Sequence, residues 1–396
     1  MTPILRDRPV QSSSSNSLSG APRPNRRAVA LGALAAASAA ALAAPAAAQA
    51  RVERAETAAV ALTPLPFVVG GRVVSDAAGL TYQWPGVYFE AAFTGGSVFF
   101  RVGDGAQILH LLIDDRRVGE LVRPAAGLYR IAGLGRAAHH VRIEVVSEHQ
   151  ARPARFGGFA LDAEGVAGTS PRRARRIEFI GDSHTVGYGA ALDRRDCTAE
   201  EVWASTDNSL AFGPLTARRY AADYQINAIS GRGVVRNYGG APLPTLPQAY
   251  PYALFDGATP YDATDGSPQV VVIDLGTNDF STPLAGGEPW ASREALRADF
   301  EATYVRFVQM LRARHGGAFL ILLTPPSAED EIAVSVGRVA ERLKAAGEQR
   351  LAVLSTGPLA FTACDWHPSR GDHQQIAGVL SAFLDAHPEV WSGTGA

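Results

Sequence analysis

The sequence predicts two consecutive folded domains: a β-sandwich and then an α/β domain. Short segments that alternate apolar and polar residues fill positions 67–161, with Gly-rich turns and no helical spacing. After residue 175, β-branched apolar runs alternate with segments of helical spacing. That alternation predicts a three-layer fold, in which a parallel sheet carries helices on both faces. We expect the first domain to span residues 55–165 and the second residues 172–392.

The composition is that of a globular chain. It has 396 residues, 46% of them hydrophobic, which is enough to bury a sizeable core in two domains. The formal net charge is -2 and there is no long basic run, so no nucleic-acid partner is indicated.

Residues 1–50 are expected to be an export signal with a disordered leader, outside the fold. The stretch 11–20 is Ser-rich and of low complexity. Arg26-Arg27 then precedes an uncharged, Ala-rich run that ends in Ala48-Gln49-Ala50, a small-x-small cleavage site. The paired arginines and the weakly hydrophobic run indicate twin-arginine export, to the periplasm or the extracellular space.

The alternative for this leader is a transmembrane anchor. An alanine run that is broken by Pro45 partitions weakly into lipid, which disfavours an anchor. We therefore expect no membrane partner after the signal has been cleaved.

The strands of the first domain are predicted from their one-sided apolar pattern. The sets that share a face are Val87, Phe89, Ala91 and Phe93 in one segment and Val141, Ile143 and Val145 in another. Gly-rich turns between short strands favour a jelly-roll-like sandwich. This part of the sequence does not concentrate His, Cys or carboxylate residues at the spacing of a catalytic or metal site. We therefore expect a packing or carbohydrate-contacting module.

Three histidines of this domain, His110, His139 and His140, are the candidate metal ligands. Adjacent residues on a strand point to opposite faces, so His139 and His140 would chelate poorly. We expect solvated positions and no metal site.

The second domain is predicted to alternate strands and helices. The expected strands are 176–180, 225–230, 270–275, 318–326 and 350–356, and the expected helices are 210–224, 293–314, 331–347 and 372–387. Folds of this kind bind ligands beyond the carboxyl ends of their strands.

Polar blocks stand at or near those strand ends. They are Gly181-Asp182-Ser183, Ser230-Gly231-Arg232-Gly233, Gly276-Thr277-Asn278-Asp279 and Cys364-Asp365-Trp366-His367-Pro368. Together they supply the parts of an acyl-transfer site. Ser183 suits a nucleophile and His367 the base that activates it. The backbone N–H of Gly231 and the side-chain amide of Asn278 suit the stabilisation of an oxyanion.

These blocks resemble the SGNH, or GDSL-type, hydrolase superfamily over residues 176 to about 390. The resemblance implies that Ser183 is the nucleophile and His367 the base. It also implies an oxyanion hole made by the N–H groups of Ser183 and Gly231 and the Asn278 side chain. The longer matches "SGRGVVRNYGG" and "CDWHPS", behind a β-sandwich, look like carbohydrate esterase family two. Members of that family remove acetyl groups from plant polysaccharides such as xylan and glucomannan, without a cofactor.

One position departs from the superfamily pattern. The residue three places before the catalytic histidine is usually aspartate, but here it is Cys364, and Asp365 stands two places before His367. The third member of a triad orients the imidazole and stabilises its cation. Either Asp365 or a backbone carbonyl can fill that place, and we assign the orienting role to Asp365 as an expectation.

Other residues near these blocks receive secondary roles. Trp366 beside His367 can stack on a sugar ring or belong to the core, and we expect it to face substrate. His184 is expected to be structural or substrate-facing, because its side chain leaves the backbone beside Ser183. Asp182 and Asp279 are expected to fix loops. A glycosidase that uses two carboxylates is disfavoured, since it leaves Ser183 without a purpose.

Cys197 and Cys364 are the only cysteines. In an exported protein they can pair, and a bond would tie the loop after Ser183 to the loop before His367. The alternative is two unrelated buried thiols.

We therefore expect an exported serine esterase that acts on an acetylated carbohydrate, with no metal or organic cofactor. Two other functions compete with this one. One is a lipase or thioesterase of the same superfamily, and the other is a non-catalytic carbohydrate-binding protein.

Overall fold

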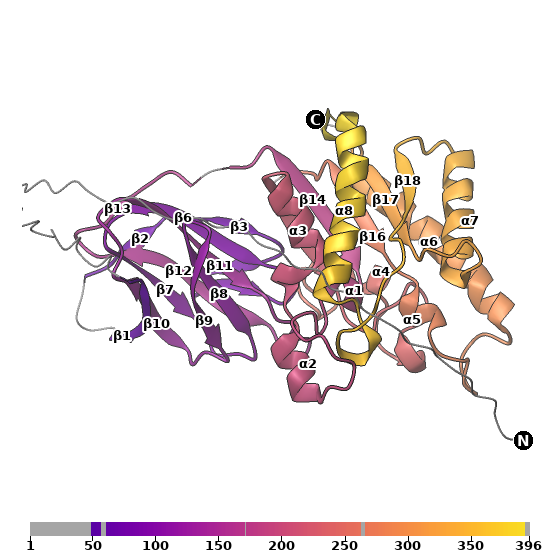
Figure 1. Ribbon diagram of the computed structural model, residues 1–396, viewed down its shortest axis with the longest axis horizontal. Helices are drawn as coiled ribbons and strands as arrows, with labels where there is room; N and C mark the ends of the chain where they lie inside the picture. The colour runs from indigo at the N-terminus through magenta and orange to yellow at the C-terminus, as the bar shows by residue number, and fades with distance from the viewer. Residues whose placement is uncertain (1–48, 57–60, 171, 263–265, 393–396) are drawn as a thin grey trace, which may run out of the picture. The chain divides into compact units, whose positions relative to one another are not determined.

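The computed structural model describes residues 49–56, 61–170, 172–262 and 266–392 (Figure 1). Apart from its last two residues, the expected export signal at 1–50 lies outside them. Both sheet systems described below belong to one unit, Ala48–Ala396.

The first part of the chain is built from antiparallel strands. They are β1 (Arg51–Ala55), β2 (Thr63–Leu65), β3 (Val68–Gly70), β4 (Val74–Asp76), β5 (Gly79–Tyr82), β6 (Tyr88–Thr94), β7 (Ser97–Val102), β8 (Ile108–Ile113), β9 (Arg116–Val122), β10 (Gly127–Ala132), β11 (Ala138–Val145), β12 (Ala154–Leu161) and β13 (Val166–Ala167). One sheet runs β1-β10-β7-β12-β5-β4 with β2 beside β12, and the other runs β13-β6-β11-β8-β9 with β3 beside β6. Because β1 already pairs with β10 at Arg51, the sheet starts before the expected boundary at residue 55.

The two sheets enclose one hydrophobic core. The side chains that were predicted to share a face of β6 and of β11 all lie in it, so the period-two pattern is confirmed. Phe89 of β6 stacks on Phe156 of β12 with ring centroids 3.9 Å apart, which joins the sheets directly. The predicted solvated position of His110 is wrong, since it is only 6% exposed and faces Glu120 and Asp207.

The second part of the chain is built on a parallel sheet. Its strands are β14 (Arg175–Gly181), β15 (Ala222–Ala228), β16 (Val270–Asp274), β17 (Phe319–Thr324) and β18 (Leu351–Ser355). Its helices are α1 (Ser183–Val186), α2 (Ala199–Ser205), α3 (Phe212–Arg219), α4 (Leu246–Ala249), α5 (Thr277–Phe280), α6 (Arg293–Arg314), α7 (Glu331–Ala345) and α8 (Arg370–Ala386), with 3₁₀ turns η1 (Asn208–Leu210), η2 (Tyr238–Gly240), η3 (Cys364–Trp366) and η4 (Pro388–Ser392). The strand order is β15-β14-β16-β17-β18, so β14 is an inner strand.

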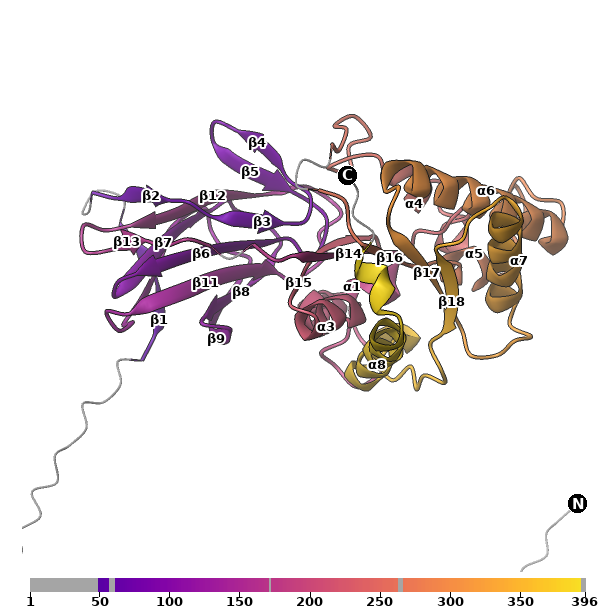
Figure 2. The ribbon, with the colours of Figure 1, turned by 90° about the horizontal axis from the view of Figure 1, so that it is seen from above.

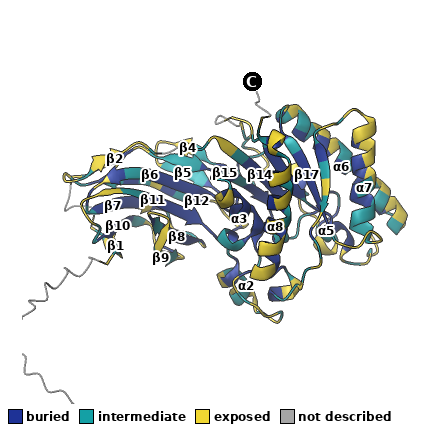
Figure 3. Cartoon of the chain, turned by 45° about the horizontal axis from the view of Figure 1, so that its top comes forward, coloured by how far each residue is buried: buried dark blue, intermediate teal, exposed yellow. Residues whose placement is uncertain are grey.

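Alternate residues of the parallel strands pack on different helices. Val271 of β16 belongs to the cluster formed with α6 and α7, whereas its neighbour Val272 belongs to the cluster formed with α3 and α8. Figure 2 shows these helix pairs on opposite sides of the sheet, and Figure 3 shows the strands buried between partly exposed helices. The near-continuous apolar strands follow from this double burial.

One predicted helix is too long. We expected a helix over 210–224, but α3 ends at Arg219, and Ala221 takes a left-handed φ of 47°. From Ala222 the chain runs as β15 beside β14. Tertiary pairing with β14 therefore overrides the local helical spacing of residues 222–224.

Residues of the β-sandwich lie inside the core of the parallel-sheet domain. The Trp84 side chain is fully buried in the cluster with α6, and its Nε1 donates to the Tyr252 carbonyl at 3.2 Å. Arg72 is also fully buried and donates to the Tyr250 and Tyr252 carbonyls. The two domains therefore share a continuous interior.

Candidate active site

Ser183 stands on a tight turn at the carboxyl end of β14. Gly181 is the last residue of β14. A Cβ added to it would lie 2.0 Å from the Thr185 hydroxyl oxygen, so only glycine fits there. The Asp182 carboxylate accepts the His184 N–H at 3.1 Å and caps α1. Gly187 ends that turn in a left-handed conformation, and its N–H donates to the Ser183 carbonyl. The short helix thus places Ser183 at the sheet edge, where ligands of such folds bind.

The structure brings His367 to Ser183, which lies 184 residues away in sequence, with His367 Nε2 at 2.9 Å from Ser183 Oγ. His367 Nδ1 lies 3.0 Å from the Cys364 carbonyl and 3.1 Å from the Asp365 carbonyl. Carbonyl oxygens only accept hydrogen bonds, so Nδ1 carries the proton and Nε2 is free to accept the serine proton. This is the geometry of a nucleophile beside its general base.

The expected orienting role of the Asp365 carboxylate is wrong in this structure. Asp365 and Trp366 both have left-handed φ values, 52° and 60°, and this turn directs main-chain carbonyls at the His367 ring. The Asp365 carboxylate instead accepts a hydrogen bond from the Tyr188 hydroxyl at 2.8 Å. Backbone carbonyls therefore take the place of the third triad member.

Tyr188 is a site residue that sequence reasoning missed. Its ring stacks on the His367 ring, with centroids 4.1 Å apart and planes 26° apart. The hydrogen bond to Asp365 holds the tyrosine in that position. Nothing in the local sequence distinguishes Tyr188 from the other tyrosines, so only the three-dimensional contact reveals it.

Burial of the His367 ring lowers its pKa to about 4, and the neighbouring His184 reinforces this shift. The bonds to the two carbonyls and the charge of Asp365 act in the opposite direction. The ring of His184 stands edge-on to that of His367, with centroids 5.6 Å apart. The His367 ring is therefore neutral, and able to accept a proton, well into the acidic range.

The acid limb of kcat/KM for ester hydrolysis is expected to lie near pH 4 rather than near 6.5, the ordinary pKa of histidine. As the pH falls through the pKa of His367, the ring is protonated and can no longer take the serine proton. Initial rates from about pH 3 to 8, with circular dichroism at each pH, test this. Asp182, whose pKa is raised to about 7 by burial, contacts His184 N–H and Asn278 and not the serine hydroxyl. An acid limb centred near pH 6.5 in the folded enzyme contradicts the prediction.

The candidate oxyanion donors come from three loops. Within the described residues, the N–H groups of Ser183 and Gly231 donate to no protein acceptor. Gly231 has a φ of 81°, and an added Cβ there would meet open space, so backbone conformation and not crowding calls for glycine. Asn278 Nδ2 donates to Asp182 Oδ2 and to the Arg232 carbonyl, both at 2.9 Å. Both N–H groups of the Asn278 amide thus already have acceptors. To contact an oxyanion, one of them must be shared between its present acceptor and the oxyanion.

Asp279 fixes the loop that carries Gly231. Its carboxylate accepts the backbone N–H groups of Val234, Val235 and Arg236 at 2.9, 2.8 and 2.9 Å. Burial raises the pKa of Asp279 to about 6, and these three bonds oppose the shift. Asp182 and Asp279 thus act as loop-fixing acceptors, as the sequence predicts.

Cys197 and Cys364 form a disulfide in the structure. The same two loops are also joined by main-chain contacts, since the Asp365 N–H donates to the Arg195 carbonyl at 2.8 Å. The loop after the nucleophile turn and the loop that carries His367 are therefore linked covalently. Cys364 itself is fully buried.

Trp366 stands at the surface next to the site, 65% exposed. The Arg195 guanidinium lies over its ring at 3.5 Å from the centroid, which holds the indole in place. Its expected contact with substrate stays a prediction.

No group of three or more His, Cys, Asp or Glu side chains in the described ranges is arranged to hold a metal ion. Helices long and apolar enough to cross a bilayer are likewise absent from this part of the chain.

Known families match both halves of the chain. The model described as "Carbohydrate esterase 2 N-terminal" matches residues 69–171, and that of the "GDSL-like Lipase/Acylhydrolase family" matches residues 179–388. A Cellvibrio japonicus acetylxylan esterase / glucomannan deacetylase is 42% identical over 340 residues, covering 84% of this chain and 94% of the relative. A cellulase/esterase of Acetivibrio thermocellus is 28% identical over 78% of this chain, but the match covers only 38% of that larger protein.

Solved structures are similar over the same length. One carbohydrate esterase superposes with a TM-score of 0.79 at 42% identity, covering 83% of this chain and all of the other. A family two carbohydrate esterase from Clostridium thermocellum, in complex with cellohexaose, superposes with a TM-score of 0.72 at 26% identity, covering 82% of this chain and all of the other. The β-rich domain, the SGNH hydrolase domain and these relatives agree: the chain belongs to carbohydrate esterase family two, and it is a carbohydrate esterase.

Proposed function

We propose that the protein is an exported esterase that removes O-acetyl groups from xylan, glucomannan or their oligosaccharides through an acetyl-enzyme. The proposal depends above all on the 2.9 Å contact between His367 Nε2 and Ser183 Oγ, with the tautomer set by carbonyls on Nδ1. The acetylxylan esterase activity of the relative that is 42% identical supports the acetyl group and the polymers. The cellohexaose complex of the Clostridium thermocellum esterase supports a sugar chain as ligand.

The proposed reaction uses the contact between Ser183 and His367. Ser183 Oγ attacks the acetyl carbonyl carbon while its proton passes to His367 Nε2. The N–H groups of Ser183 and Gly231 and the Asn278 amide hold the oxyanion of the tetrahedral intermediate. When the intermediate collapses, the bond from the acyl carbon to the sugar oxygen breaks, and the imidazolium gives its proton to that oxygen.

Water then resolves the acetyl-enzyme. His367 takes a proton from the water, whose oxygen attacks the acyl carbon, and returns a proton to Ser183 Oγ as acetate leaves. No step needs a metal or an organic cofactor. The charge on the imidazolium is balanced by the Cys364 and Asp365 carbonyls and by the face of the Tyr188 ring.

Several structural expectations belong to the same proposal. Residues 1–50 direct export to the periplasm or the extracellular space and are then removed. The first domain, whose sheet starts at Arg51 and not at the expected residue 55, acts as a jelly-roll-like sandwich to about residue 165, and residues 172–392 act as a three-layer hydrolase domain. Trp366, exposed beside His367, supplies a stacking face for a sugar ring.

Acetate release from acetylated xylan and acetylated glucomannan tests the function. We expect release by the wild type and none above background by Ser183→Ala, which removes the nucleophile but leaves the turn intact. Activity that prefers octanoyl to acetyl esters would instead indicate a lipase or thioesterase. Binding of the polymers with no hydrolysis of any ester would indicate a carbohydrate-binding protein.

A further inference from the structure

A segment of the β-sandwich reaches the loop that carries Gly231. β11 ends at Val145, and in the segment that follows, the side chains of Glu148 and Gln150 contact Ser230 at the start of the hydrolase loop 230–233. The Ser230 N–H donates to Glu148 Oε1 at 2.8 Å. Gln150 Nε2 donates to the Ser230 carbonyl and to Glu148 Oε1, both at 3.1 Å. Both main-chain polar groups of Ser230 are thus held by the other domain.

The bond to the Ser230 carbonyl acts on the Gly231 N–H. The two groups belong to one planar peptide and, in a trans peptide, point in opposite directions. Gln150 therefore sets the direction of the Gly231 N–H by holding the other end of the same peptide. Gly231, at φ 81°, has no side chain of its own to restrict its backbone torsions. Hydrogen bonds from outside the loop therefore matter for the orientation of its peptide.

The same segment also reaches the nucleophile turn. The Val146 carbonyl accepts the Asn208 N–H at 2.8 Å. The Asn208 side chain is buried, and its Nδ2 donates to the carbonyls of Thr185 and Val186 at 3.2 and 3.0 Å. These are the last two residues of α1, which begins at Ser183. One stretch of the sandwich thus contacts the loop of Gly231 directly and the turn of Ser183 through Asn208.

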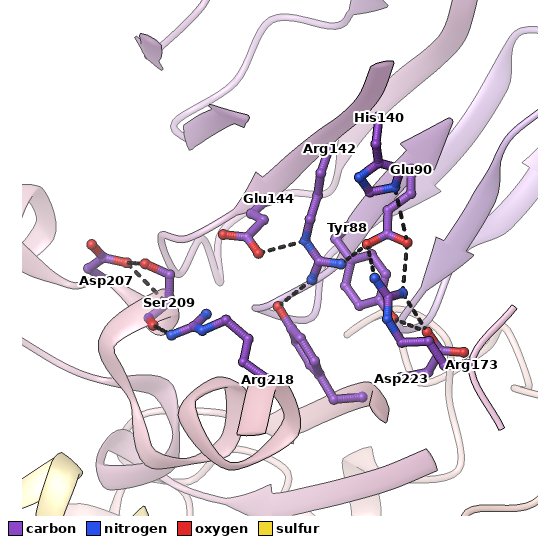
Figure 4. Close-up of polar contacts among 11 residues, drawn as sticks. Tyr88, Glu90, His140, Arg142, Glu144, Arg173, Asp207, Ser209, Arg218 and Asp223 are labelled. Carbon is purple, nitrogen blue, oxygen red and sulfur yellow. Dashed lines mark hydrogen bonds and ion pairs between the residues drawn. The ribbon is translucent and has the colours of Figure 1, made fainter. Parts of the chain in front are cut away.

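A cluster of buried and partly buried charges joins the two domains on the strands that lead to this contact (Figure 4). Arg142 of β11 pairs with Glu90 of β6 and donates to the Tyr224 hydroxyl of β15 at 3.1 Å. Arg173 bridges Glu90 at 2.7 Å and Asp223 of β15 at 2.9 Å. Charged groups that are buried together tolerate little displacement, because an unpaired partner is strongly destabilising.

The cluster lies on the two strands that run toward this contact. β11 continues past Arg142 and ends at Val145, shortly before Glu148, and β15 continues past Tyr224 and ends at Ala228, shortly before Ser230. Each strand therefore ends close to one partner of the 2.8 Å bond. His149 lies between the two contact residues, is 7% exposed and packs edge-on against Tyr82. His149 therefore anchors this segment in the β-sandwich, while the side chains of Glu148 and Gln150 contact Ser230 of the hydrolase domain.

We propose that Glu148 and Gln150 are positioning residues of the esterase reaction, which hold the Ser230–Gly231 peptide so that the Gly231 N–H faces the oxyanion. This inference rests on the proposed function, in which Gly231 donates to the oxyanion. It makes the β-sandwich a structural part of the active site, whether or not it also binds polysaccharide.

Steady-state kinetics on 4-nitrophenyl acetate and acetylated xylan test the inference in the full-length chain. Glu148→Ala and Gln150→Ala are expected to lower kcat about tenfold, a fraction of the 10²–10³ lost when an oxyanion donor is removed, and to leave KM within about twofold. Glu148→Gln keeps an oxygen that accepts the Ser230 N–H, and it is expected to retain kcat within about threefold of wild type. Because Gln150 is exposed, Gln150→Ala is expected to fold like the wild type.

Tyr88→Phe is the matched control at the domain contact. It removes the 2.8 Å bond from the Tyr88 hydroxyl to Asp223, but it leaves the ion pairs of Arg142 and Arg173 in place and does not touch the catalytic loops. It is expected to lower Tm while kcat stays unchanged. A similar loss of kcat in Tyr88→Phe would mean that general loosening of the domains explains the effect, and would overturn the proposal.

Two other results also decide the question. An active wild type with unchanged kcat in both Glu148→Ala and Gln150→Ala overturns the positioning role and leaves the esterase function standing. A wild type that hydrolyses neither ester overturns the proposed function, and the positioning role with it.

Discussion

His367→Ala is expected to lower kcat for acetyl ester hydrolysis by about 10⁴-fold, whereas Asp365→Asn is expected to lower it by less than about tenfold. The first change removes the group that lies 2.9 Å from the nucleophile. The second leaves the Cys364 and Asp365 carbonyls on Nδ1, because these belong to the main chain. Asparagine also keeps an oxygen that can accept the Tyr188 hydroxyl proton.

Initial rates of acetate release by the purified variants, with Tm as a check on folding, measure this contrast. Removal of a true triad aspartate costs as much as 10⁴ in kcat, about the same as the expected His367→Ala effect. A loss of that size in Asp365→Asn, at unchanged Tm, would mean that the carboxylate turns to His367 in solution. The contrast thus separates a dyad held by carbonyls from a triad.

Loss of the disulfide is expected to lower the free energy of unfolding by up to about 5 kcal/mol. Cys197 and Cys364 are 167 residues apart, and closing so long a loop removes much of the chain entropy of the unfolded state. The bond also ties the His367 loop to the loop after the nucleophile turn, so activity is expected to fall with stability.

Thermal unfolding of the wild type with and without reductant, beside the Cys197→Ala/Cys364→Ala double variant, tests this. Reductant is expected to lower the wild-type Tm to that of the double variant and to leave the double variant unchanged. Alkylation and mass measurement show whether reduction is complete. A fully reduced wild type with an unchanged Tm would contradict the prediction.

The candidate site was predictable wherever it depends on the ends of parallel strands. The carboxyl ends of β14, β15 and β16 must meet at one edge, so the blocks at Ser183, Gly231 and Asn278 could be placed together from their order alone. His367 could be added because base chemistry requires an imidazole and its block stands before the last helix. The apolar faces of β6 and β11 were predictable for the same kind of reason, since strand periodicity is local.

Contacts that depend on the path of one loop were not predictable. The turn at Asp365 and Trp366 takes left-handed φ values that local sequence does not require of these residues, and it decides that carbonyls, not the carboxylate, face His367. The early end of α3 has a similar cause, because pairing of β15 with β14 outweighs helical spacing.

The sequence by itself determined the division into a β-sandwich and an α/β domain, the strand ends that carry chemistry, and the identity of the nucleophile and base candidates. Those properties are encoded in residue type and in periods of a few residues. Only the tertiary structure decided what holds these groups: Tyr188 on the His367 ring, and Glu148 and Gln150 on the Ser230–Gly231 peptide. Such contacts join residues about 80 to 180 positions apart, and their geometry is set by domain packing, which no local pattern records.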